Sequence, residues 1–202
     1  MTPLDVLKVL VGGYLTYDFI RYIAKGGLRR QYAMFCRTSW TRILGLVGQS
    51  TVIFSLVLVA GALLWMAWPD VFGFSWLNLL ARRGESGTNL MVAPAGIPYF
   101  GVFFYLLLML NIPRLARIEE YRFRLRTRDW PHAVRRSIRF GLAHCIIGVP
   151  IGFGLAISIG GLWFSYQYFR GGIRRSILAH TVYNWTVLAL LGGFAVYDYI
   201  SG

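Results

Sequence analysis

The chain has 202 residues, of which 56% are apolar, 16% aromatic and only 14% charged. Soluble globular proteins carry about 25% charged residues, so this composition argues against an ordinary soluble enzyme. The net charge is +13, from 21 basic and 8 acidic residues, and the high apolar content excludes a disordered tail. Long apolar runs between basic blocks predict one integral membrane domain over residues 1–202.

Four stretches have the length and apolar character of membrane segments, for which roughly 20 residues are needed. In chain order they are residues 4–20, 43–68, 94–113 and 176–200. The first contains three charged residues, so it either spans the bilayer or lies at its surface. The second and third contain no charged residue, and the last is interrupted only by His180 and Asp198.

The run 140–169 is too long for one upright span. It has 30 residues without a charged group apart from His144, and a single helix of that length would measure about 45 Å. Gly148 and Pro150 fall near its middle, where such residues break or kink a helix. We therefore expect two short helices joined by a turn. The predicted fold is an all-α membrane protein with about six membrane segments, some of them short or hairpin-like.

The basic residues predict the orientation of the chain. Eighteen of the 21 lie in three blocks, residues 21–42, 114–139 and 170–175. Basic loops stay on the cytoplasmic side, so the three blocks share that side and the loop 69–93 lies opposite. We expect the chain in the bacterial plasma (inner) membrane, with its basic blocks facing membrane lipid and no nucleic-acid partner.

Ionisable side chains at membrane depth are candidates for function, because they are costly to place there. Glu119 and Glu120 follow the third predicted span, while His144 and His180 each lie five residues after a basic block. Asn184 is one helical turn beyond His180 and shares its face. All five are predicted to lie shallowly below the cytoplasmic surface. There a glutamate can act as general base on water, while imidazoles and an amide stabilise an oxyanion.

Three short motifs occur in order in the second half of the chain. Residues 119–124 (Glu-Glu-Tyr-Arg-Phe-Arg) fit EExxxR, residues 140–144 fit FxxxH, and residues 180–184 fit HxxxN. In this combination the chain resembles the CPBP family of CAAX proteases and bacteriocin-processing enzymes, also called the Abi family. The resemblance covers about residues 95–200 as a catalytic core. It leaves residues 1–93 as N-terminal membrane segments without a recognised motif.

The resemblance implies an intramembrane endopeptidase that hydrolyses a peptide bond in a membrane-associated peptide or protein tail. By family analogy, Glu119 activates a water molecule together with His144. His180 and Asn184 would hold the oxyanion of the tetrahedral intermediate. The site would lie near the cytoplasmic face of the membrane.

Other residues of the motifs are expected to support this site. Glu120 and Arg124 are spaced for an ion pair on one helix, and Phe140 is expected to orient its motif helix by packing. Glu119 and the two motif histidines are also residue types that bind zinc. Their spacing is not HExxH, so a metal-free and a zinc-dependent mechanism both stay open.

A non-catalytic interpretation stays open as well. The two glutamates can form a helix-end ion-pair cluster with nearby arginines, and buried histidines can simply bond a neighbouring helix. Only 25 residues separate Glu119 from His144, and the loop between them is rich in arginine, whose charge weakens a carboxylate as a base. The alternative function is therefore a CPBP-like subunit or assembly factor of a larger membrane protein complex.

Overall fold

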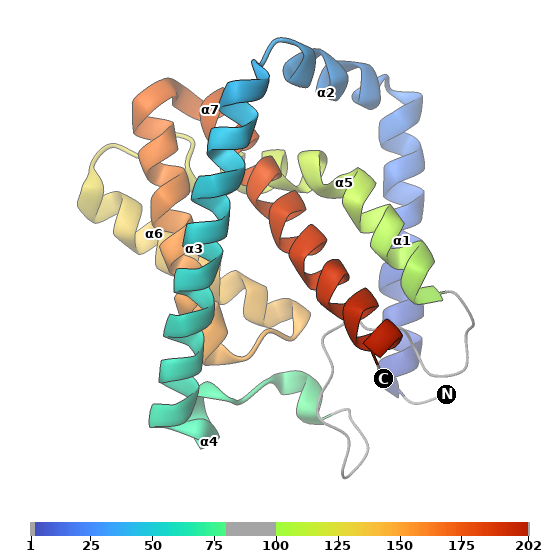
Figure 1. Cartoon of the computed structure of the whole chain (residues 1–202), viewed down its shortest axis with the longest axis vertical. Coiled ribbons are helices and arrows are strands. Elements are labelled where there is room, and N and C mark those ends of the chain that lie inside the picture. Colours follow the sequence, from blue (N-terminus) through green and yellow to red (C-terminus); the bar gives the residue numbers. More distant parts are fainter. Residues whose placement is uncertain (1–2, 80–99, 202) are drawn as a thin grey trace.

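The computed structural model describes residues 3–79 and 100–201 of the chain (Figure 1). Over these residues the expected all-α class is confirmed, with seven α-helices, two short 3-10 turns and no strand. The elements are α1 (Pro3–Ala24), α2 (Gly27–Cys36), α3 (Trp40–Ala67), α4 (Pro69–Phe72), η1 (Trp76–Leu79), α5 (Phe100–Phe123), α6 (Trp130–Ala143), η2 (His144–Ile147) and α7 (Ile151–Ser201).

Among the described residues, α3 is the one helix that is long and apolar enough to cross a membrane. Its 28 residues correspond to a length of about 42 Å. Many of its large apolar side chains are exposed, including Leu44, Val52, Leu56, Val59, Leu63 and Met66. The helix ends at Ala67, and the backbone of the next residue, Trp68, is not helical because Pro69 follows it. The run 43–68 is thus confirmed as a candidate span.

Helix α5 extends further than the sequence predicted. Residues 94–99 of the expected third span lie outside the described residues, and α5 begins at Phe100. The helix then continues through Pro113, where the span was expected to end, and stops only at Phe123. Neighbouring elements can compensate a proline inside such a helix. As a result, Glu119 and Glu120 lie on α5 itself, in its last turns.

The hairpin expected over residues 140–169 has a different first arm. Helix α6 begins ten residues earlier, where Asp129 caps it by accepting a hydrogen bond of 2.8 Å from the backbone N–H of His132. The turn does lie at 148–150, and Gly148 has a φ of 94°, which favours glycine. Because α6 includes the basic residues Arg135, Arg136 and Arg139, it is amphipathic and differs from the short apolar arm that was predicted.

Helix α7 consists of two arms that diverge at a bend. The backbone leaves the helical conformation at Gly171 and Gly172, and Gly172 has a φ of 71°. Figure 1 shows the first arm (orange) rising beside α3 and the second arm (red) descending beside α5. The first arm also packs on α6, so α7 touches each of the elements that carry a motif.

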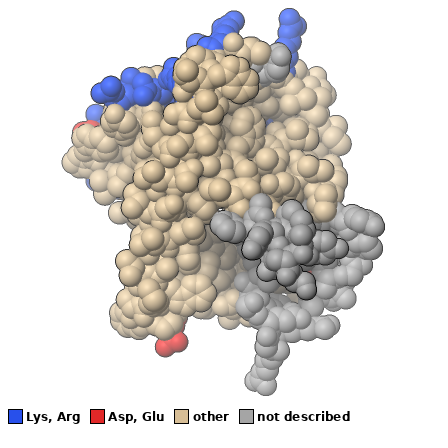
Figure 2. Space-filling view, in the orientation of Figure 1, with Lys and Arg blue, Asp and Glu red and all other residues tan. Residues whose placement is uncertain are grey.

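On the face visible in Figure 2, the described basic residues gather at one end of the molecule. Figure 2 shows Lys and Arg along the upper border of the visible face, where α2 and the bend of α7 lie in Figure 1. Helix α4 lies at the other end of α3. Residues 80–93 of the loop expected on that opposite side lie outside the described residues.

Small residues let α6 and the first arm of α7 approach closely. A Cβ atom added to Gly141 would overlap the carbonyl oxygen of Gly154 and the hydroxyl of Ser158. We therefore expect Gly141→Ala to lower the free energy of unfolding by about 1–3 kcal/mol, because overpacking forces the helices apart. Thermal unfolding of the purified protein in detergent micelles measures this as a lower Tm.

The matched control is Gly48→Ala in α3, where nothing lies within 4 Å of the added Cβ atom. Alanine has the higher helix propensity, so this variant should be unchanged or more stable by up to about 1 kcal/mol. An equal loss of Tm in both variants would contradict the close packing of α6 on α7.

Candidate active site

The three motifs converge on one cavity of about 670 Å³. Four of the residues predicted to be catalytic line it, namely Glu119, His144, His180 and Asn184. Phe140 also lines the cavity, together with apolar side chains from α1, α3, α5 and α7. The site is therefore a small polar patch in a mainly apolar cavity, the usual character of a ligand site.

The two adjacent glutamates point in different directions from α5. Neighbouring residues on a helix are about 100° apart, so both cannot face the cavity equally. The Glu119 side chain is 33% exposed, whereas that of Glu120 is fully buried. Glu119 is thus accessible to water and ligands, and Glu120 belongs to the protein interior.

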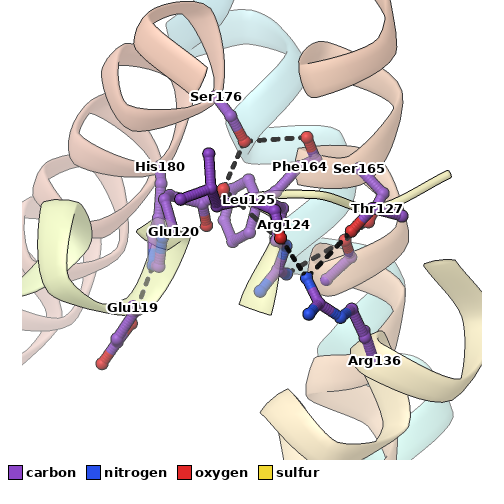
Figure 3. Close-up of polar contacts among 11 residues, drawn as sticks. Glu119, Glu120, Arg124, Leu125, Thr127, Arg136, Phe164, Ser165, Ser176 and His180 are labelled. Atoms are coloured by element: carbon purple, nitrogen blue, oxygen red, sulfur yellow. Dashed lines mark hydrogen bonds and ion pairs between the residues drawn. The ribbon is translucent and has the colours of Figure 1, made fainter. Parts of the chain in front are cut away.

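His180 lies between the two glutamates (Figure 3). Its Nδ1 is 2.8 Å from Glu120 Oε1, and its Nε2 is 3.4 Å from Glu119 Oε2. The imidazole also stacks on the Phe164 ring at a centroid distance of 4.1 Å. Since the ionised Glu120 carboxylate accepts hydrogen bonds, His180 donates from Nδ1. Its Nε2 then shares a proton with Glu119 whenever the two are hydrogen-bonded.

The other oxygen of Glu120 is also held. The Ser176 hydroxyl contacts Glu120 Oε2 and lies 2.8 Å from the Phe164 carbonyl oxygen. Arg124 Nε is 3.7 Å from the same carboxylate oxygen, in the i,i+4 geometry of one helix. A buried carboxylate is stable when an opposite charge and hydrogen bonds surround it, so this cluster anchors Glu120 and, through it, His180.

The buried guanidinium of Arg124 connects three helices. Its Nη2 donates to the Gly161 carbonyl oxygen of α7 at 3.0 Å. Its charged group lies over the Phe140 ring of α6 at 4.2 Å from the centroid, a cation–π contact. Phe140 in turn meets the rings of His144 and His180 edge to face, at 4.8 and 5.5 Å. Phe140 therefore packs against both motif histidines.

The hydrogen bond of His144 determines which of its ring nitrogens is free. Its Nδ1 lies 2.9 Å from the Phe140 carbonyl oxygen. A carbonyl oxygen only accepts, so Nδ1 must carry the proton. In a neutral His144, Nε2 then has its lone pair available on a residue that lines the cavity.

The structure adds a contact that the sequence did not predict, between Glu119 and His180, the residue assigned to the oxyanion. His144, the expected partner of Glu119 in activating water, lines the same cavity. Sequence reasoning also missed Ser176 and Phe164. Ser176 has a signal, since it lies one helical turn before His180 on the same face. Phe164 has none, because the α7 bend brings it to the site.

The arginine-rich loop is directed away from the cavity. Arg136 donates to the Leu125 carbonyl oxygen at 2.6 Å and lies 3.3 Å from the Thr127 hydroxyl (Figure 3). The other arginines of the loop and of α6 are exposed, namely Arg126, Arg128, Arg135 and Arg139. Within residues 3–79 and 100–201, no arginine lines the cavity beside Glu119. The positive charge of the loop thus lies at the surface, away from the cavity.

A zinc ion does not fit these residues. In residues 3–79 and 100–201, no group of three or more His, Cys, Asp or Glu side chains is arranged to hold a metal ion. Both ring nitrogens of His180 face carboxylates, and Nδ1 of His144 faces a carbonyl oxygen. We therefore derive no step through a metal.

Comparison with known protein families, with curated proteins and with solved structures finds no match for this chain. A proposal for its function therefore rests on the geometry of the site and on the three motifs.

The two glutamates should differ sharply in their effect on stability. Replacing Glu120 with glutamine leaves the Arg124 charge buried without its counter-ion, so we expect Glu120→Gln to cost about 3–5 kcal/mol. Glu119→Gln should cost about 1 kcal/mol or less, because that side chain is partly exposed. Thermal unfolding in detergent compares them, and equal Tm values would contradict the buried cluster.

Proposed function

We propose that this chain is an intramembrane endopeptidase of the CPBP type, which cleaves a membrane-associated peptide or protein tail with a water molecule activated by Glu119. One observation carries the proposal: the four side chains of the three separate motifs line a single cavity. They come from α5, η2 and α7, and up to 65 residues separate them in the sequence.

The proposed reaction uses side chains that line the cavity. Glu119 takes a proton from water, and the water oxygen attacks the carbonyl carbon of the peptide bond. The free Nε2 of His144 accepts the other hydrogen bond of that water. When the carbon–nitrogen bond breaks, Glu119 returns the proton to the leaving amine, and the products are a carboxylic acid and an amine.

The oxyanion of the tetrahedral intermediate needs donors on the other side of the carbonyl. The Asn184 amide and a protonated Nε2 of His180 are such donors, and both residues line the cavity. Glu120 holds the imidazole ring in place for this role, because its carboxylate accepts from Nδ1. In this mechanism the substrate oxygen takes the place of Glu119 as the acceptor of the His180 proton.

The surroundings of the site favour an apolar substrate segment in a membrane. The cavity walls carry many large apolar side chains, including Phe54, Phe104, Leu108, Ile112, Phe153 and Leu188. The proposed setting is the bacterial plasma membrane, with about six membrane segments and the motifs near the cytoplasmic face. The apolar exterior of α3 and the basic end of the molecule support it.

Two features favour the non-catalytic alternative, a subunit or assembly factor of a larger membrane complex. Glu119 already has a partner, since His180 Nε2 lies 3.4 Å away. A second groove of about 940 Å³ lies between the α2–α3 region and the second arm of α7, and its walls are mainly apolar. Such a groove suits a helix of a partner protein.

The peptidase proposal predicts large losses of activity for the cavity residues. Glu119→Gln and His144→Ala should each lower kcat/KM by about 10²–10⁴-fold, as expected for general acid–base groups. Asn184→Ala should lower it by about 10²–10³-fold through the oxyanion. The assay uses the protein in lipid nanodiscs with a proteome-derived peptide library, and mass spectrometry identifies the cleaved bonds.

The matched control is His132→Ala, since this third histidine lies in the first turn of α6 and does not line the cavity. It should retain wild-type activity. If Glu119→Gln and His144→Ala cut as fast as the wild type, the mechanism is wrong. Co-purification of a stoichiometric partner that Glu119→Gln does not disturb, without cleavage of any peptide, would favour the alternative.

The orientation in the membrane predicts how Cys36 reacts. This cysteine is the last residue of α2 and is exposed, and α2 lies at the basic end of the molecule. A membrane-impermeant maleimide should therefore label it in inside-out vesicles and leave it unlabelled in right-side-out vesicles. Val71→Cys on α4, in a Cys36→Ser background, should show the opposite pattern. Labelling of Cys36 in right-side-out vesicles would reverse the proposed topology.

A further inference from the structure

Helix α6 presents a stripe of apolar side chains that remains exposed in the described part of the chain. Four large side chains recur at every fourth residue and are 39–51% exposed, namely Trp130, Val134, Ile138 and Leu142. A different face of the same helix is buried on the body of the protein and consists of Ala133, Ser137, Phe140 and Gly141. The apolar stripe is therefore additional to the face that holds α6 in the fold.

The exposed basic residues of α6 lie next to the apolar stripe. Each residue turns the helix by about 100°, so steps of four drift by about 40° and the stripe spans about 120°. Arg135 and Arg139 fall just beyond its edge, on the side away from the buried face, and both are exposed. The helix thus carries a buried face, an exposed apolar face and an exposed basic face in turn.

We propose that α6 is a docking helix for an anionic membrane surface. Its apolar stripe enters the boundary of the acyl chains, and Arg135 and Arg139 bind lipid phosphates. Helices that lie in a membrane interface have this division into an apolar and a basic face. The planar guanidinium group matches phosphate oxygens with two hydrogen bonds, which suits arginine to this contact.

The positive charge of residues 126–139 favours an anionic membrane over other partners for this face of α6. Residues 126–139 contain five arginines and one acidic residue, Asp129, whose side chain is occupied as the cap of α6. A second copy of this chain would bring an equally basic face, on a protein of net charge +13. An anionic lipid surface supplies the opposite charge and, directly beneath it, the apolar layer that the stripe needs.

The ends of the stripe are placed for this contact. Trp130 packs on the Phe169 ring at 5.1 Å, so a residue type typical of the membrane interface is held at the start of the helix, near the bend of α7. Leu142 lies at the other end, just before the turn 148–150. The docking surface does not depend on peptidase activity, since it lies on the outer side of α6.

The test compares full-length protein in nanodiscs of phosphatidylcholine alone and of phosphatidylcholine with phosphatidylglycerol. Amide hydrogen exchange across residues 130–143 should slow several-fold when phosphatidylglycerol is present. Arg135→Gln/Arg139→Gln should abolish this difference. The matched control, Arg37→Gln/Arg42→Gln, also removes two exposed arginines, but from outside α6, and it should retain the difference.

The apolar stripe has its own variant. Val134→Ser should lose much of the protection of α6 by phosphatidylglycerol. Val71→Ser, a valine of equal exposure (41%) on α4, should not. Equal exchange of α6 in both lipid mixtures would overturn the proposal. Protection that instead rises with protein concentration in detergent would also overturn it, in favour of contact between two copies.

Discussion

The fold around the site depends on the buried guanidinium group of Arg124. A charge without solvent is costly, so every element near it must supply an acceptor, an opposite charge or a π face. Glu120 supplies the opposite charge, Gly161 a carbonyl oxygen and Phe140 an aromatic ring. These partners come from α5, α7 and α6, so the contacts of one side chain fix the relative positions of the three helices that carry the motifs.

The contacts of Arg124 also give the two adjacent glutamates different roles. Glu120 is committed to Arg124, Ser176 and His180, and it therefore orients the imidazole and keeps Nδ1 as a donor. Glu119, one residue earlier, is left partly exposed in the cavity.

The sequence predicts the parts of this structure that depend on local pattern. The apolar run of α3, the glycine–proline turn at 148–150 and the i,i+4 spacing of Glu120 and Arg124 can all be seen in the residues. The start of α6 could not be predicted, because its arginine-rich sequence resembles that of a polar loop. The buried face of the helix becomes apparent only in the folded structure. The contact of Phe164 with His180 depends on the bend of α7, a tertiary feature that no local pattern encodes.

Helix α6 connects the proposed active site to the proposed membrane contact. Its inner face carries Phe140, whose ring touches Arg124 and both motif histidines, and its end leads directly into His144. Its outer face carries the apolar stripe and two exposed arginines. Because α6 packs closely on α7 at Gly141, the helix moves as one unit. A lipid contact that fixes the outer face of α6 therefore also fixes the place of His144 in the cavity.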